Sequence, residues 1–376
     1  MPGLLDDVDP HGLLEYSVVY TDRALNHMSQ NFQQVMLDIS ETLKTVYHAN
    51  AVAVVPGSGT FGMEATARQF ATGKKCLVIR NGWFSYRWTQ ILEMGQIPSA
   101  ALVLSARAME DGKTPEFEPA PIEEVVSTIK KERPEVVFAP HVETSAGMIL
   151  PDDYIRRVGE AVHSVGGLFV LDCIASGTLW IDMTALEVDV LISAPQKGWS
   201  GSPCCALVMM SELARRRVSE TTSTSFACDL GKWLQIMEAY EKGGHAYHAT
   251  MPTDALTMFR GVMQEAAQHG FDALKEKQQI LGARIRKLLV DRGFKSVAAD
   301  GFQAPGVVVS YTDDSDIHNG SRFAASGIQI AGGVPLMCNE PEGFRTFRVG
   351  LFGLDKLNHI DRTAENFEKA LVKICE

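Results

Sequence analysis

The 376-residue chain lacks the long apolar runs and the basic blocks that mark two large classes of protein. No stretch approaches the roughly 20 apolar residues that a membrane-spanning helix needs. The formal net charge is −11, and no cluster of lysine and arginine could follow a phosphate backbone. We therefore expect neither a membrane nor a nucleic acid among its partners.

Cysteine and histidine are also missing from the patterns that build disulfide frameworks and zinc sites. The seven cysteines are an odd number without a C-x-x-C spacing, and the ten histidines contain no H-E-x-x-H motif. The N-terminal stretch MPGLLDDVDPHGLLEYS is acidic and lacks the charged-then-apolar pattern of a signal peptide. These absences predict a cytoplasmic protein with reduced thiols and no bound metal.

What the chain does contain is a regular alternation of short apolar runs and helical patterns from about residue 50 onward. Seven runs are rich in β-branched residues: 51–55, 76–79, 100–104, 135–139, 168–172, 189–193 and 205–209. Continuous apolar strands separated by helices are typical of a mostly parallel sheet covered on both faces. We therefore predict a doubly wound α/β domain with a mostly parallel sheet of about seven strands.

The pattern changes after Met251. Helices are expected over about 252–270, 273–292 and 358–375, with strand-like pieces at 306–311 and 347–352, which together indicate a smaller α+β domain. The first 45 residues form an extended piece followed by a helix. The expected division is an N-terminal region over 1–45, a large α/β domain over 46–255 and a small α+β domain over 256–376.

The first of three candidate site features is the turn PGSGTFGMEA over 56–65, directly after the first strand. Its glycines would let the backbone approach an anion, the N–H groups of the following helix would point at it, and Ser58 and Thr60 would add hydroxyl donors. The turn matches neither a G-x-x-x-x-G-K-[ST] nor a G-x-G-x-x-G motif. Taken alone, it is more often an ordinary turn.

The other two features are Asp172 and Lys197, each at the end of an apolar strand. Read alone, Asp172 could cap the next helix and Lys197 could simply reach water. Because ligands bind at the carboxyl ends of parallel strands, the two side chains would share one crevice. Burial there would lower the lysine pKa, as an imine-forming amine requires.

An anion-binding turn, a strand-end aspartate and a strand-end lysine together fit pyridoxal 5′-phosphate. The lysine would hold this cofactor as a Schiff base, the aspartate would pair with the ring nitrogen, and the turn would bind the phosphate. The sequence therefore predicts a pyridoxal-phosphate enzyme.

The chain resembles the class V aminotransferase family (fold type I), and within it the alanine–glyoxylate and serine–glyoxylate aminotransferases. The resemblance covers about residues 35–376. It depends on motifs in the family's order, namely GSGTFGMEA, NGWFSYR, VETSAG, LDCIAS, SAPQKG, YHATMPT and FRVGLFG. It implies the fold of that family, a transaminase activity and a homodimer with shared active sites.

Carried over residue by residue, the resemblance makes Lys197 the Schiff-base lysine and the proton carrier, and Asp172 the partner of the ring nitrogen. Ile174 would pack on one ring face and Phe84 on the other, with Trp83 as the alternative to Phe84. The phosphate ligands of the same subunit would be Ser58, Gly59, Thr60 and Gln196.

The resemblance also assigns residues around the substrate and from the partner subunit. Tyr247 and Thr250 would reach across to the partner's phosphate, although a helix-capping loop is the alternative for Tyr247. Thr144 and Ser145 would lie near cofactor or substrate. Arg348 would clamp the substrate carboxylate, although read alone it is a strand-edge arginine.

The chain departs from the family in residues 15–29, where relatives carry a glycine- and proline-rich segment. This stretch would bring Tyr20, Thr21, Arg23 or His27 near the pocket mouth, and it leaves the identity of the substrates open.

Three functions follow from the residues. The first is a transaminase that moves an amino group from a small amino acid (alanine-, serine- or aspartate-like) to a small 2-oxo acid such as glyoxylate or pyruvate.

The second function is a β-elimination lyase or a desulfurase, for which Cys228 is the one loose candidate. The third is a non-catalytic binding protein, which would not need Lys197, Asp172 and Arg348 together. Arg87 keeps the family spacing, and a structural salt bridge is as good an interpretation of it as a substrate contact.

Overall fold

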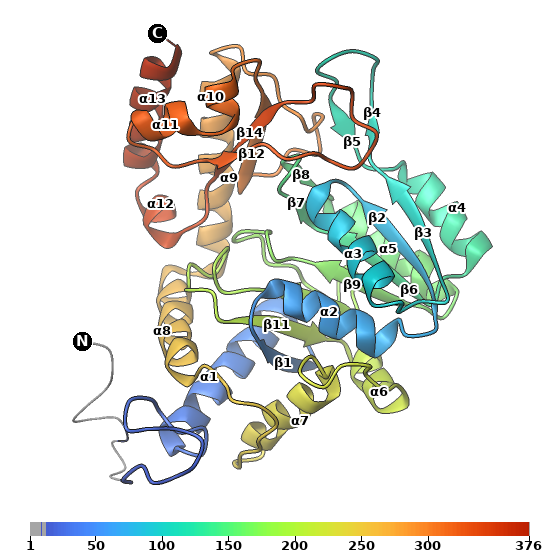
Figure 1. Ribbon diagram of the computed structural model, residues 1–376, viewed down its shortest axis with the longest axis vertical. Coiled ribbons are helices and arrows are strands. Elements are labelled where there is room, and N and C mark those ends of the chain that lie inside the picture. Colours follow the sequence, from blue (N-terminus) through green and yellow to red (C-terminus); the bar gives the residue numbers. More distant parts are fainter. Residues whose placement is uncertain (1–8, 10–12, 376) are drawn as a thin grey trace.

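The computed structural model describes residue 9 and residues 13–375 (Figure 1). Residues 1–8, 10–12 and 376 lie outside the described residues, and with them most of the acidic N-terminal stretch and the start of the N-terminal region predicted over 1–45. No helix within the described part of the chain is long and apolar enough to cross a membrane. All seven cysteines are free.

The large sheet contains all seven predicted strands. They are β1 (Ala51–Pro56), β2 (Lys75–Arg80), β3 (Ala100–Ser105), β6 (Val136–Pro140), β9 (Leu168–Asp172), β10 (Val190–Ser193) and β11 (Cys205–Met210). Their spatial order is β1-β11-β10-β9-β6-β2-β3, and β11 runs antiparallel to both neighbours while the other pairs are parallel. The predicted mostly parallel seven-stranded α/β fold is confirmed.

Helices cover both faces of this sheet, so that its strands β9, β10 and β11 are buried along their whole length. On one face α2 (Gly59–Phe70) contacts α3 (Trp83–Met94), and on the other α4 (Ile122–Glu132) contacts α5 (Asp152–Ser164). Helices α1 (Gln30–Tyr47) and α7 (Leu230–Glu241) pack at the β1 end. Helix α6 (Glu212–Glu220) follows β11.

A second sheet of three strands stands above the large one in Figure 1, in the order β12 (Val307–Tyr311), β14 (Thr346–Gly350), β13 (Ala331–Gly332). It has a core of its own, which includes Leu281, Phe347 and Leu371. The long helices of this part are α9 (Phe271–Val290) and α13 (Ile360–Cys375), whereas α8 (Thr253–His269) packs against α1 and contributes Leu256 and Phe259 to the core of the large sheet. The division of the chain at residues 45 and 255 stays a prediction.

Short elements complete the described chain. The helices are α10 (Ser315–His318), α11 (Ser321–Ala325) and α12 (Leu354–Asn358), and the two-residue strands are β4 (Arg107–Ala108), β5 (Phe117–Glu118), β7 (Val142–Glu143) and β8 (Met148–Ile149). The hairpin β7–β8 follows β6 at the carboxyl edge of the large sheet. This edge faces the three-stranded sheet, so residues from both sheets can meet there.

Candidate active site

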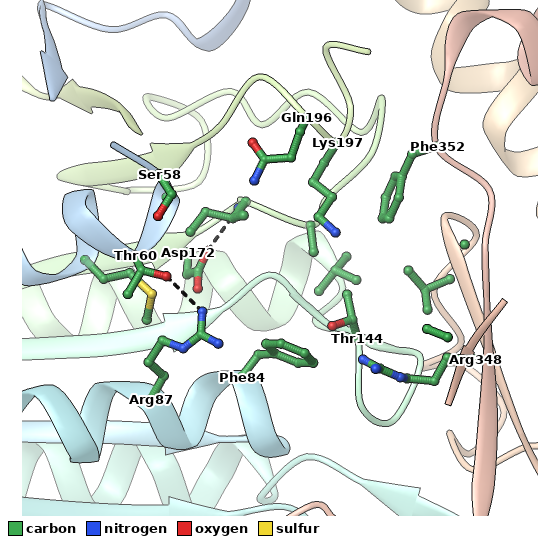
Figure 2. Close-up of a pocket in the computed structure, with 18 of the residues that line it drawn as sticks. Ser58, Thr60, Phe84, Arg87, Thr144, Asp172, Gln196, Lys197, Arg348 and Phe352 are labelled. Carbon is green, nitrogen blue, oxygen red and sulfur yellow. Dashed lines mark hydrogen bonds between the residues drawn. The ribbon is translucent and has the colours of Figure 1, made fainter. Parts of the chain in front are cut away.

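A cavity of about 540 Å³ lies between the carboxyl edge of the large sheet and strands β13 and β14 (Figure 2). The sequence predicts thirteen residues that contact the cofactor or the substrate. Ten of them line this cavity: Ser58, Gly59, Thr60, Phe84, Thr144, Asp172, Ile174, Gln196, Lys197 and Arg348. The structure thus brings together side chains that are up to 290 positions apart in the chain (348 − 58 = 290).

The anion cradle forms where β1 turns directly into α2. The helix begins at Gly59, so its first N–H groups are free of intrahelical partners, and Ser58 makes no side-chain capping bond that would occupy its hydroxyl. A Cβ atom on Gly59 would lie 2.5 Å from Ile174 Cδ1, so only glycine lets this turn approach Ile174 closely. The end of the cavity at Gly59 therefore has the donors that a phosphate needs.

Gln196 adds a second observation at this end of the cavity. Its Oε1 atom is buried and has no hydrogen-bond partner among the described residues. A buried amide without a partner is costly for a fold, so this side chain is available to a bound group.

Asp172, at the end of β9, is a buried carboxyl group that is only 9% exposed. Burial raises its pKa to about 7, although the 2.9 Å hydrogen bond that Ile174 N donates to Oδ1 acts in the opposite direction. A positive charge placed beside Asp172, such as the protonated ring nitrogen of pyridoxal 5′-phosphate, would favour the ionised carboxylate again.

Lys197 follows β10 by four residues and points into the same cavity (Figure 2). Among the described residues, no carboxylate forms an ion pair with its ammonium group and no acceptor forms a hydrogen bond with it. Burial, followed by the nearby positive charge of Arg348, lowers the Lys197 pKa. Its amine is therefore more easily neutral than that of a surface lysine, which is the state that attacks a carbonyl group.

Arg348 projects from β14 across the cavity from Asp172. Its Nε atom donates a 2.8 Å hydrogen bond to Gly332 O, which fixes the side chain. Its two terminal nitrogens have no partner within the described chain, so both can donate to one carboxylate.

Phe84 and its neighbours hold the start of α3 at the cavity wall. The ring of Phe84 lies 5.4 Å from Arg87 Cζ and 5.5 Å from Arg348 Cζ. The Arg87 guanidinium donates a 2.9 Å bond to Thr60 Oγ1 and forms no salt bridge with any described residue. The interpretation of Arg87 as a structural salt bridge therefore finds no support.

Glu143 is a residue whose importance sequence reasoning missed. Its side chain is fully buried and accepts hydrogen bonds from Phe84 N (3.2 Å), Ser85 N (2.8 Å) and Ser85 Oγ (2.6 Å). A carboxylate at a helix N-terminus satisfies donors that the helix cannot satisfy itself. The available signal was a glutamate just after an apolar strand, in VETSAG.

Three predicted residues do not line the cavity of this chain. Ser145 is fully buried, where its hydroxyl donates to Glu143 Oε1 (2.7 Å) and accepts from Trp83 N (2.9 Å). Tyr247 and Thr250 lie outside the cavity, and their hydroxyl oxygens are 3.1 Å apart. Tyr247 is 53% exposed, so it is open to contact with another molecule.

The atypical segment over 15–29 also lies away from the cavity of its own chain, because none of its residues lines it. The Tyr20 hydroxyl donates to Met251 O (3.1 Å), and the His27 ring lies 5.4 Å from the Tyr247 ring. The expectation that this segment reaches the pocket mouth is therefore not met within one chain. The segment packs on the loop that carries Tyr247.

The chemistry of these groups fits pyridoxal 5′-phosphate. The cavity combines an amine without an ion-pair partner, a buried carboxyl, an anion cradle and an aromatic ring. Within the described residues, no cluster of three or more histidine, cysteine or acidic side chains could bind a metal ion.

Comparisons with known proteins agree with this geometry, although no family model matches the chain. It is 26% identical to alanine–glyoxylate aminotransferase of Mus musculus over 370 residues, which cover 93% of this chain and 82% of the relative. It is 28% identical to 2-aminoethylphosphonate–pyruvate transaminase 2 of Paraburkholderia xenovorans, over 94% of this chain and 90% of the relative.

Solved structures show the same fold. Alanine–glyoxylate aminotransferase from Nostoc sp. superposes with a TM-score of 0.76 at 22% identity, covering 92% of this chain and 88% of the other. Aspartate aminotransferase of subgroup IV from Thermus thermophilus gives a TM-score of 0.75 at 22% identity, covering 99% and 98%.

The fold is therefore that of the fold type I pyridoxal-phosphate enzymes, and the relatives that the chain resembles are aminotransferases. The predicted resemblance to the class V aminotransferases is confirmed over nearly the whole chain. The predictions of an aminotransferase-type enzyme and of pyridoxal 5′-phosphate as its cofactor are confirmed with it.

Proposed function

We propose that the protein transfers an amino group from a small amino acid (alanine-, serine- or aspartate-like) to a small 2-oxo acid such as glyoxylate or pyruvate, in two ping-pong half-reactions. The observation that carries this proposal is the presence of Lys197, Asp172 and Arg348 on one cavity, with the lysine unpaired. The relatives are named for alanine and glyoxylate or for 2-aminoethylphosphonate and pyruvate, and these names support a small donor and a small acceptor.

Each part of the cofactor would be bound by a different set of cavity residues. When bound, pyridoxal 5′-phosphate supplies an electron-withdrawing ring that makes the Cα proton of an attached amino acid acidic. Ser58, Gly59, Thr60 and Gln196 would hold the phosphate, and Asp172 would accept the hydrogen bond of the ring nitrogen. Ile174 and Phe84 would pack on the two ring faces, with Thr144 close to them, whereas the Ser145 hydroxyl is taken up by Glu143 and Trp83 N.

Lys197 and Arg348 would act on the substrate. Lys197 Nζ would anchor the cofactor covalently and, once released, would take the proton from Cα and deliver it to the cofactor carbon that had carried the aldehyde. Arg348 would bind the carboxylate through its two free terminal nitrogens, which keeps the Cα–H bond in one orientation.

A second copy of the chain would complete each site. The exposed Tyr247, with Thr250, would reach the phosphate of the partner, so the homodimer is part of the proposal. We also place the protein in the cytoplasm, which agrees with seven free cysteines.

The desulfurase alternative is the weaker one. A desulfurase needs a mobile cysteine at the site, whereas Cys228 is buried, and no cysteine lines the cavity. Elimination on the same cofactor remains the second candidate, and product analysis separates it from transamination.

The test is the stoichiometry of products from the purified protein with alanine and glyoxylate. Transamination yields pyruvate and glycine in equal amounts and only when both substrates are present. Release of ammonia together with a 2-oxo acid from serine, without any acceptor, would contradict the proposal and favour a lyase.

A further inference from the structure

Phe352 is a cavity residue to which the sequence patterns give no role. It lies two positions after β14 and faces Lys197 on the side of the cavity where Arg348 lies (Figure 2). Its ring rests against backbone: Cβ atoms added at Gly306, Gly177 and Gly350 would lie 3.3, 3.7 and 3.8 Å from ring carbons. Because these three positions lack a Cβ atom, the ring packs close to the backbone, which fixes its position.

The ring of Phe352 lies against the Lys197 ammonium group. Lys197 Nζ lies 5.2 Å from the Phe352 ring centroid. Within the described chain, no carboxylate or hydrogen-bond acceptor takes this place. A cation at this distance from an aromatic face is attracted by the ring's quadrupole, which opposes the effect of burial on the lysine.

The same ring forms part of the cavity wall near Arg348. Val142, Val307 and Ile330 also line the cavity, together with the polar side chains of Thr144 and Gln329. Arg87 lies on the other side of Phe84, where it bonds to Thr60, so it adds no second cation to this wall (Figure 2). A substrate held by its carboxylate on Arg348 would turn its side chain toward apolar groups, with Phe352 among them.

We propose that Phe352 positions Lys197 and restricts the substrate. Its face holds the protonated amine of Lys197 in place whenever the amine is not bound covalently, and its ring limits the substrate to small side chains. The restriction rests on the proposed transaminase function, whereas the contact with Lys197 does not.

Phe352→Leu tests the contact with Lys197, because leucine keeps an apolar side chain and removes the aromatic face. The measurement is the rate at which an amine-specific reagent modifies Lys197 in the cofactor-free, full-length protein, followed against pH by mass spectrometry of the Lys197 peptide. Since the ring favours the ammonium form, the apparent pKa should fall by about half a unit in the variant.

Phe344→Leu is the matched control, because Phe344 is also half-buried, packs beside Phe117 and Tyr311, and lies outside the cavity. It should leave the Lys197 pKa unchanged. An unchanged pKa in Phe352→Leu, or an equal shift in Phe344→Leu, would overturn this half of the inference.

Phe352→Ala tests the restriction on size. The ratio of kcat/KM for norvaline to kcat/KM for alanine, with one 2-oxo acid as acceptor, should rise at least tenfold, because each methylene that a pocket admits or rejects changes this ratio by about that factor. Phe344→Leu should not change it. Phe352→Val replaces the alanine variant if circular dichroism shows that the latter is unfolded.

An unchanged ratio in the smaller Phe352 variant would overturn the restriction. If the unaltered protein transaminates no amino acid, the proposed function fails and the restriction with it. The Lys197 pKa measurement, which needs no turnover, still decides the other half.

Discussion

Lys197, Asp172 and Arg348 share a condition that explains their chemistry: each carries an ionisable group that its own chain leaves largely without an opposite charge. Burial lowers the pKa of Lys197 and of Arg348 and raises that of Asp172 to about 7. Groups shifted in this way are concentrated at functional sites, because a ligand supplies the missing partner.

Arg348→Ala should raise the apparent KM for the amino acid by two to three orders of magnitude, as about 3–4 kcal/mol of charge-assisted hydrogen bonding is lost. Arg345→Ala is the matched control, because Arg345 is a neighbour outside the cavity that bonds to Asp313 O. Steady-state kinetics with alanine measure both. A KM within twofold of the unaltered protein would assign the carboxylate to another cation, such as Arg87.

Asp172→Asn should stabilise the cofactor-free protein at alkaline pH. The folded pKa of about 7 lies above the ordinary value of 3.8, so the folded chain is favoured while the carboxyl is neutral. That contribution is full below the unfolded pKa near 4 and is lost as pH rises through about 7. The asparagine variant escapes this loss, which is on the order of a few kcal/mol.

Urea unfolding of both cofactor-free proteins at pH 5 and pH 8.5 checks this result. The variant should gain stability relative to the unaltered protein mainly at pH 8.5, and it should bind the cofactor much more weakly. An equal difference at both pH values would show that Asp172 is not neutral in the folded chain.

Helix α3 depends at its first turn on a single residue from the hairpin β7–β8. Glu143 accepts from two backbone N–H groups of this turn and from two serine hydroxyls, those of Ser85 and Ser145. Because Phe84 lies in the first turn of α3, Glu143 also fixes the ring at the cavity wall.

Glu143→Ala should destabilise the protein by about 3 kcal/mol, since it leaves several buried donors without partners. Cofactor affinity should fall as well, because Phe84 is released. Glu93→Ala, on the exposed side of the same helix, should change neither. Urea unfolding and cofactor titration give the two readouts, and a stability loss below about 1 kcal/mol would refute the assignment.

At the level of elements, the sequence predicts much more of the large sheet than of the cavity wall. All seven strands follow from continuous apolar runs, because burial on both faces leaves a local signal. Strand β13, with Ala331, is only two residues long, and Gln329 and Ile330 precede it in a loop. Their place on the cavity results from packing between distant segments, which no local pattern encodes.

At the level of the whole molecule, too, some long-range contacts can be predicted from the sequence and others cannot. The motifs around Lys197 and Asp172 sit at strand ends, so their convergence follows from the sheet topology that the sequence predicts. The position of residues 15–29 on the Tyr247 loop does not follow, because it depends on contacts such as Tyr20 with Met251, more than 200 residues apart.

The proposed shared site predicts complementation between two inactive copies. Lys197→Ala abolishes the amine, and Tyr247→Ala combined with Thr250→Ala removes the proposed cross-subunit contacts. If each site takes Tyr247 and Thr250 from the partner, a mixed dimer has one intact site, and mixing after partial denaturation should recover about a quarter of full activity. If all of these residues served one chain's own site, each mixed dimer would have two defective sites and no activity would return.

Whether Lys197 carries the cofactor of a transaminase is decided by the absorption spectrum of the purified protein. With added pyridoxal 5′-phosphate we expect a visible band that alanine abolishes and that glyoxylate or pyruvate then restores. Lys197→Ala should lack this cycle. A band that forms and cycles equally in Lys197→Ala, or the absence of any band in the unaltered protein, would show that Lys197 does not have this role.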